Sequence, residues 1–166
     1  MTNVSRNFRA AKLAALLVAA LAMGACAKNP LGQDTGALAN ASAATPGSQQ
    51  DFVVNVGDRV FFNSDSSELT PQSVATLDKQ AQWLRSYSQY TFVVEGHADE
   101  RGTREYNIAL GARRAQAVHD YLVSRGVQAH RMRTISYGKE RPVAVCDDIS
   151  CWSQNRRAVT VLNASS

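Results

Sequence analysis

Residues 94–118, VEGHADERGTREYNIALGARRAQAV, gather a histidine, carboxylates and arginines within a short length of chain. The second half has a helical period, and a helical wheel predicts a buried stripe formed by Leu110, Ala117, Val118, Tyr121 and Leu122. Arg114 falls near the centre of this stripe, and Arg113 falls at its edge. A guanidinium in the core needs its charge paired and its donors bonded, so Arg114 is a candidate functional residue.

Two interpretations of Arg114 are open. It could form an internal salt bridge, which burial alone slightly favours, or it could lie at an open end of the core and bind the carboxylate of a ligand. Asp99 is a candidate partner, because it follows a predicted strand in the glycine-flanked loop GHADERG. That loop leads into a helix N-terminus, which favours anions. A carboxylate, a guanidinium and free N–H groups together would suit a zwitterionic, amino-acid-like ligand.

Catalytic alternatives have weaker support. The chain has three histidines, with His97 in the loop, His119 on the outer helix face and His130 beyond the next turn. No HExxH spacing, nucleophile elbow or phosphate-binding glycine loop is present. His97 and Glu100 could form an acid/base pair, but both are expected to face solvent. The sequence therefore predicts a protein that is not an enzyme and uses no metal or cofactor.

The N-terminus has the layout of a bacterial secretory signal. Three basic residues precede the apolar run Leu13–Met23, which is too short to remain as a membrane span. Residues 23–26, MGAC, resemble a lipobox and predict a signal over residues 1–25, with Cys26 lipidated at the mature N-terminus. An ordinary signal with Cys26 incidental is the alternative. Ala27 after the cysteine suggests sorting to the outer membrane.

The remaining charges and cysteines suit an exported domain. The formal net charge of +4 includes three basic residues of the signal, so the chain from Cys26 onward carries only +1. Such a chain has little electrostatic attraction to nucleic acid. Cys146 and Cys151 remain if Cys26 is lipidated, and the oxidising periplasm favours a disulfide between them. A metal pair lacks other ligands nearby.

The mature chain divides into residues 26–50, with the lipidated cysteine and a flexible tether, and one domain over residues 51–166. Strands are expected in FVVNV and RVFF within residues 52–62, and over 90–95, 133–137 and 157–162. Helices are expected from Thr70-Pro71 and from residue 103 or 104 to about 124, where Gly126 ends the second. This order predicts an α+β fold. We expect a two-layer sandwich of β-α-β-α-β-β order, with the helices on one face of a mixed four-stranded sheet.

Several segments carry a family resemblance: VFFNSDSSELT, EGHADERGT, YNIALGARRA, ISYGKERP and NRRAV. They resemble the signature of the OmpA-like peptidoglycan-binding domains. The resemblance implies non-covalent binding of the diaminopimelate of the peptidoglycan stem peptide, with Asp99 on the ammonium and Arg114 on the carboxylate. The positions that match the rest of the pocket are Asp65, Ala98, Arg101, Thr103, Asn107 and Leu110. Asn63 and Ser64 depart from the residues common in the family.

Resemblance to the lipid-anchored members of the family implies where the protein is located and what it does there. They lead us to expect an outer-membrane lipoprotein whose domain faces the periplasm and links the membrane to the wall, with roles in envelope integrity and cell division. The implied partners are peptidoglycan, the periplasmic TolB and the C-terminal part of TolA. A flexible tether of this length would reach roughly 25–30 Å. A peptidoglycan-cleaving hydrolase is the alternative function.

Overall fold

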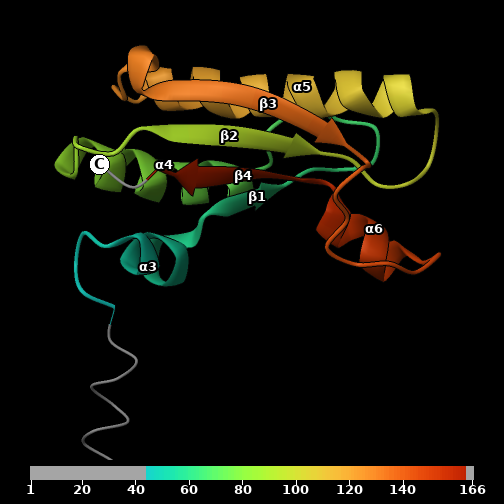
Figure 1. Ribbon diagram of the computed structural model, residues 1–166, viewed down its shortest axis with the longest axis horizontal. Helices are drawn as coiled ribbons and strands as arrows, with labels where there is room; N and C mark the ends of the chain where they lie inside the picture. Colours follow the sequence, from blue (N-terminus) through green and yellow to red (C-terminus); the bar gives the residue numbers. More distant parts are fainter. Residues whose placement is uncertain (1–43, 164–166) are drawn as a thin grey trace, which may run out of the picture. The chain divides into compact units, whose positions relative to one another are not determined.

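The computed structural model describes residues 44–163 (Figure 1). The predicted signal, Cys26 and the tether up to residue 43 lie outside the described residues. The strands are β1 (Arg59–Phe61), β2 (Phe92–His97), β3 (Met132–Gly138) and β4 (Arg157–Leu162). The helical segments are α3 (Gln49–Asp51), η1 (Phe52–Gly57), α4 (Pro71–Ser86), α5 (Arg104–Ser124), η2 (Ala129–Arg131) and α6 (Ile149–Asn155).

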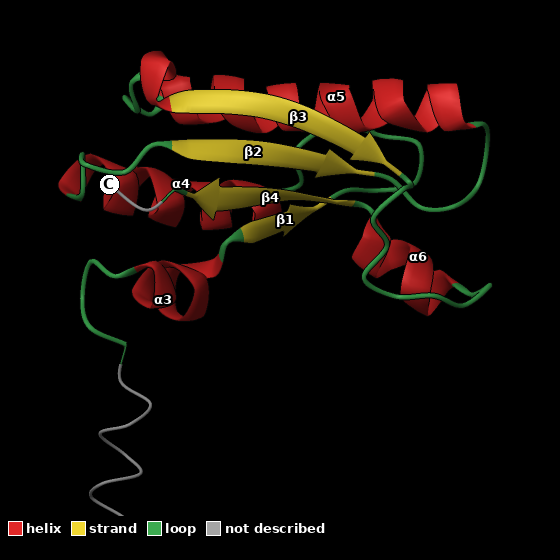
Figure 2. Cartoon of the chain, viewed as in Figure 1, coloured by secondary structure: helices red, strands yellow, loops and turns green. Residues whose placement is uncertain are grey.

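The four strands form one mixed sheet in the order β1-β4-β2-β3. β4 pairs antiparallel with both β1 and β2, and β2 pairs parallel with β3. Helices α4 and α5 lie on the same side of the sheet (Figure 2), and the core lies between these two layers. The predicted fold class is therefore confirmed. No helix within residues 44–163 is long and apolar enough to cross a membrane.

The two main helices begin where their capping residues predict. The Thr70 side chain accepts a hydrogen bond from the Ser73 backbone, and Pro71 occupies the first turn of α4. Thr103 caps α5 in the same way through the backbone of Tyr106. After α5, Gly126 has a φ of +87°, the left-handed conformation that stops a helix.

The prediction of a strand at FVVNV is wrong. Phe52–Gly57 is helical and continues from α3, whose N-cap is Ser48. The Ser48 side chain accepts from the Asp51 backbone, and Asp51 accepts from the indole N–H of Trp83 at 2.8 Å. Phe52 is buried against the Trp83 ring, whereas the two following valines are exposed. The predicted boundary at residue 51 thus falls inside a continuous helical segment that packs on α4.

A glycine pair brings α5 close to the sheet. A Cβ atom added to Gly96 of β2 would lie 1.8 Å from the carbonyl oxygen of Gly111 in α5. A side chain at Gly96 would therefore push the helix away from the strand. This close contact places the side of α5 that carries Arg114 directly beneath the end of β2.

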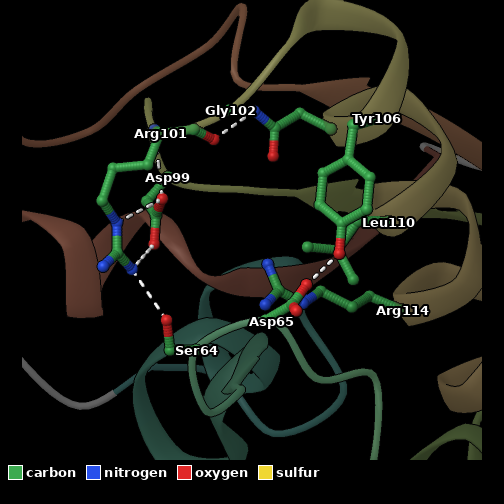
Figure 3. A pocket seen from close by; sticks show the side chains of 9 residues that line it. Ser64, Asp65, Asp99, Arg101, Gly102, Tyr106, Leu110 and Arg114 are labelled. Carbon is green, nitrogen blue, oxygen red and sulfur yellow. Dashed lines mark hydrogen bonds and ion pairs between the residues drawn. The ribbon is translucent and has the colours of Figure 1, made fainter.

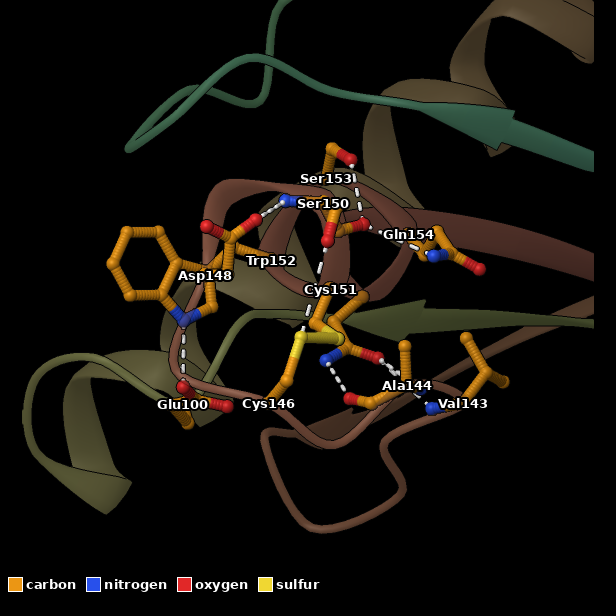
Figure 4. The surroundings of a disulfide bond; sticks show 11 residues. Glu100, Val143, Ala144, Cys146, Asp148, Ser150, Cys151, Trp152, Ser153 and Gln154 are labelled. Carbon is orange, nitrogen blue, oxygen red and sulfur yellow. Dashed lines mark hydrogen bonds between the residues drawn. A yellow bond between two sulfur atoms is a disulfide. The ribbon is translucent and has the colours of Figure 1, made fainter.

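Helix α6 was not predicted. It lies between β3 and β4 and is short, and its N-terminus is capped by Asp148. The predicted disulfide is present between Cys146 and Cys151, and it ties the preceding loop to this helix (Figure 4). Asn155, at the last position of α6, holds the same loop through the backbone of Val143 and Ala144.

Candidate functional site

A hollow of about 220 Å³ lies beside the N-terminal half of α5, between the loop after β1 and the loop after β2 (Figure 3). Its lining residues are Ser64, Asp65, Asp99, Arg101, Gly102, Tyr106, Asn107, Leu110 and Arg114. Six of the eight predicted ligand-binding residues are among them. Ala98 is buried without lining the hollow, and Thr103 caps α5 instead.

A larger hollow of about 470 Å³ follows β1. Arg59 and Arg156 line it, but no carboxylate does. It therefore offers no partner for an ammonium group. Of these two hollows in the described part of the chain, the smaller one combines the two charge signs that the sequence predicted for one site.

Arg114 is fully buried and binds backbone carbonyls. Its Nε, Nη1 and Nη2 atoms donate to the carbonyl oxygens of Ser66, His97 and Asn63 at 2.8, 2.8 and 3.1 Å. The internal salt bridge that burial favoured is absent from the described residues. Burial, followed by the charge of Arg156, lowers the Arg114 pKa to about 10, so the group remains a cation at neutral pH.

The contacts of Arg114 have a structural counterpart elsewhere in the domain. Arg131 is also buried and donates to three backbone carbonyls, those of Tyr90, Leu84 and Tyr87. Neither these carbonyls nor Arg131 line the hollow. Binding three carbonyls is therefore a structural task in this fold, and Arg114 performs it for the loop of residues 63–66, which carries Ser64 and Asp65.

Asp99 is already paired. Its carboxylate accepts from the Nε and Nη2 of Arg101 at 3.1 and 2.6 Å and from Nη1 of Arg156 at 3.4 Å. Burial acts to raise the Asp99 pKa, but the hydrogen bonds from Arg101 and Arg156 outweigh it and hold the pKa below its usual value. The side chain predicted to receive a ligand ammonium is thus occupied by two arginines of the chain itself.

Asp65 has the more available carboxylate. One of its oxygens accepts a hydrogen bond from the Tyr106 hydroxyl, and it forms no salt bridge within residues 44–163. Its φ of +55° is the only positive φ at a non-glycine residue in that range, and it directs the side chain toward the hollow (Figure 3). A left-handed conformation at aspartate is uncommon and costs backbone energy, which is frequent at functional sites.

His97 does not face solvent as predicted. It ends β2, is only 2% exposed, and has no hydrogen bond on either ring nitrogen. Its Nε2 lies 3.6 Å from a Glu95 carboxylate oxygen, too far for a hydrogen bond, and its ring lies beside Tyr137. Burial and the charges of Arg157 and Arg141 lower its pKa to about 4. Neither ring nitrogen bonds Glu100, whose carboxylate accepts from the Trp152 indole instead, so the two residues do not form an acid/base pair in this structure.

Gly102 and Tyr106 also line the hollow, although neither was predicted from the sequence. The signal for Tyr106 was available, because it lies one turn before Leu110 on the same helix and so shares its face. No group of three or more histidine, cysteine or acidic side chains within residues 44–163 could hold a metal ion.

Comparisons with known proteins identify the family of the chain. The OmpA family model matches residues 61–158. The peptidoglycan-associated lipoprotein of Rhizobium meliloti is 63% identical over 167 residues, which cover 99% of this chain and 93% of the relative. That of Pseudomonas aeruginosa is 44% identical over 136 residues, covering 82% of this chain and 80% of the relative.

Solved structures show the same fold. The peptidoglycan-associated lipoprotein from Burkholderia pseudomallei is 44% identical with a TM-score of 0.62, covering 64% of this chain and 90% of that one. The C-terminal domain of Helicobacter pylori MotB shares the fold, with 22% identity and a TM-score of 0.61. The match covers 66% of this chain and 86% of that one. With a family model over more than half of its length and relatives of this identity, the chain belongs to the OmpA family and, within it, to the peptidoglycan-associated lipoproteins.

Proposed function

We propose that the domain binds peptidoglycan non-covalently by taking the diaminopimelate of the stem peptide into the hollow beside α5. The observation that carries this proposal is the meeting of Asp65, Asp99, Arg101 and Arg114 in one small cavity. The free end of diaminopimelate has one ammonium and one carboxylate. A site with both charge signs is complementary to it.

The contacts in the cavity suggest a division of roles. The ligand ammonium meets Asp65, whose carboxylate is the less occupied one, rather than Asp99. The carboxylate meets Arg101, whose Nη1 makes no hydrogen bond within the described residues. Asp99 fixes Arg101, and Arg114 fixes the loop that carries Asp65 while adding positive charge beneath the cavity.

We further propose that the protein is anchored in the outer membrane through Cys26 and joins the Tol-Pal system. TolB and TolA are its proposed protein partners, and a mechanical link between membrane and wall is its proposed role. A lipid anchor confines the domain near the wall. The resulting effective concentration allows a site of modest affinity to hold the envelope together.

Asp65→Asn is expected to weaken binding to purified sacculi by about thirtyfold, because a carboxylate that pairs with the ligand ammonium is lost. Asparagine is nearly isosteric and tolerates the left-handed backbone, so the melting temperature should stay near that of wild type. Co-sedimentation with sacculi measures the binding, and thermal melts check the fold.

Asp78→Asn is the matched control. Asp78 also accepts from a tyrosine hydroxyl, that of Tyr121, but lies outside the cavity. It should bind sacculi as wild type does. Equal binding by Asp65→Asn and wild type would refute the ligand assignment. Release of soluble wall fragments by the purified protein would favour the hydrolase.

Cys26→Ser is expected to move the protein from the membrane fraction to the soluble periplasmic fraction, because acyl chains provide the proposed anchor. Fractionation of cells that express either form tests this, with sucrose-gradient separation of inner and outer membranes for the wild type. A serine variant that remains as firmly bound to membranes as wild type would show that Cys26 is not the anchor.

A further inference from the structure

Arg101 is a flexible side chain held in one position. It is 43% exposed at its side chain, yet it makes two hydrogen bonds to Asp99 and one to Ser64 Oγ at 2.8 Å. A free arginine on a loop loses considerable rotamer entropy when it is fixed in this way. Besides Asp99 and Ser64, a third side chain contacts its guanidinium.

Trp152 of α6 contacts Arg101 from outside the cavity. The guanidinium carbon of Arg101 lies 4.3 Å from the centre of the indole ring, which is a cation–π arrangement. The indole Nε1 donates to the carboxylate of Glu100 at 2.6 Å (Figure 4). One side chain thus holds two successive residues of the loop after β2. Lys139, directly after β3, holds the same loop through the carbonyls of Glu100 and Gly102.

Trp152 is itself fixed by the way α6 is tied down. The disulfide joins Cys151, its neighbour, to Cys146, and Asn155 is buried and bonded to the loop before the helix. The residue that follows the helix, Arg156, donates to Asp99 at 3.4 Å. The segment 146–156 therefore contacts the Asp99–Arg101 pair at two points, through Trp152 and Arg156.

We propose that Trp152 is a positioning residue of the wall-binding site: it holds Arg101 in place for the carboxylate of the ligand, and so α6 sets the affinity for the wall. This inference rests on the proposed function. Trp152 lies outside the residues that line the cavity and acts through Arg101. An indole that merely completes the packing of α6 would not have this effect.

A double-mutant cycle tests the coupling. Sacculus affinity is measured for the full-length protein in detergent as wild type, Trp152→Ala, Arg101→Ala and the double variant. Loss of a cation–π contact should make Trp152→Ala bind about three- to tenfold more weakly. In the Arg101→Ala background the same change should have no further effect, because the side chain it positions is gone.

Two further variants separate positioning from stability. Trp152→Phe keeps a ring against Arg101 and should bind within about twofold of wild type. Ile149→Ala removes another side chain of α6, one that is 58% exposed, and should leave binding unchanged. Thermal melts of all variants show whether a loss of affinity follows a loss of stability.

The outcomes distinguish this inference from the proposed function. If Asp65→Asn weakens binding but Trp152→Ala does not, the positioning role is overturned and the proposed function stands. The same holds if Trp152→Ala weakens binding equally with and without Arg101. If wild type does not bind sacculi, both are overturned. Non-additive loss together with rescue by phenylalanine supports the positioning role.

Discussion

Arg114→Lys is expected to weaken sacculus binding by about thirtyfold or more, and also to destabilise the domain by about 2 kcal/mol or more. The planar guanidinium reaches three carbonyls, two of which belong to residues Asn63 and Ser66 on either side of Ser64 and Asp65. An ammonium keeps the charge but cannot reproduce this planar set of donors. The loop that presents Asp65 would then lose its fixed position. Co-sedimentation with sacculi and urea denaturation measure the two effects.

Arg131→Lys is the matched control, since Arg131 makes the same type of contact to three carbonyls outside the cavity. It should lose a comparable unfolding free energy and yet bind sacculi as wild type does at temperatures where both variants are folded. Equal loss of binding by the two lysine variants would show that affinity follows stability alone. Arg114 would then be purely structural.

The sequence located Arg114 correctly but not its partners. Helical periodicity placed it in the buried stripe, since the spacing of Leu110, Val118 and Leu122 fixes the face of α5. Its hydrogen bonds go to carbonyls 17 to 51 residues away in the chain. Only the tertiary fold brings these loops together, and periodicity contains no information about them.

The same limit explains the other errors. Asp99 was available in sequence as a carboxylate for a ligand, but Arg156, 57 residues later, reaches it only through the pairing of β4 with β2. FVVNV has the composition of a strand, but the segment is helical in the fold, where Phe52 packs on Trp83 of α4, 31 residues later. The helix caps at Thr70 and Thr103 were predictable because capping depends on residues within one turn.

His97 gives a second prediction with a large effect. The stability of the domain is expected to fall by about 3 kcal/mol because of this residue alone as the pH decreases from about 6.5 to 4. Its pKa is about 4 in the folded protein, against an ordinary value of 6.5, because burial and the charges of Arg157 and Arg141 oppose protonation. The Glu95 carboxylate, 3.6 Å from Nε2, does not offset them.

The sign follows from proton binding. Between pH 6.5 and 4 the unfolded chain binds a proton at His97 that the folded protein does not, so lowering the pH favours unfolding, and the full stability is present above pH 6.5. His97→Leu removes the titrating group along with two buried nitrogens that lack hydrogen-bond partners. Urea denaturation across this range should show a shallower pH dependence for the variant, by about 3 kcal/mol relative to wild type.

His130→Gln, at an exposed histidine, should retain the wild-type pH dependence of stability and serves as the control.

Protonation of His97 is also expected to affect the proposed site, because the carbonyl oxygen of His97 accepts a hydrogen bond from Arg114 at 2.8 Å. A proton forced onto the buried ring would disturb the end of β2 that this bond holds. Wall binding by wild type is therefore expected to weaken near pH 4 before the domain unfolds, and less so for His97→Leu. Identical pH profiles of stability for His97→Leu and wild type would show that the buried ring is protonated without cost.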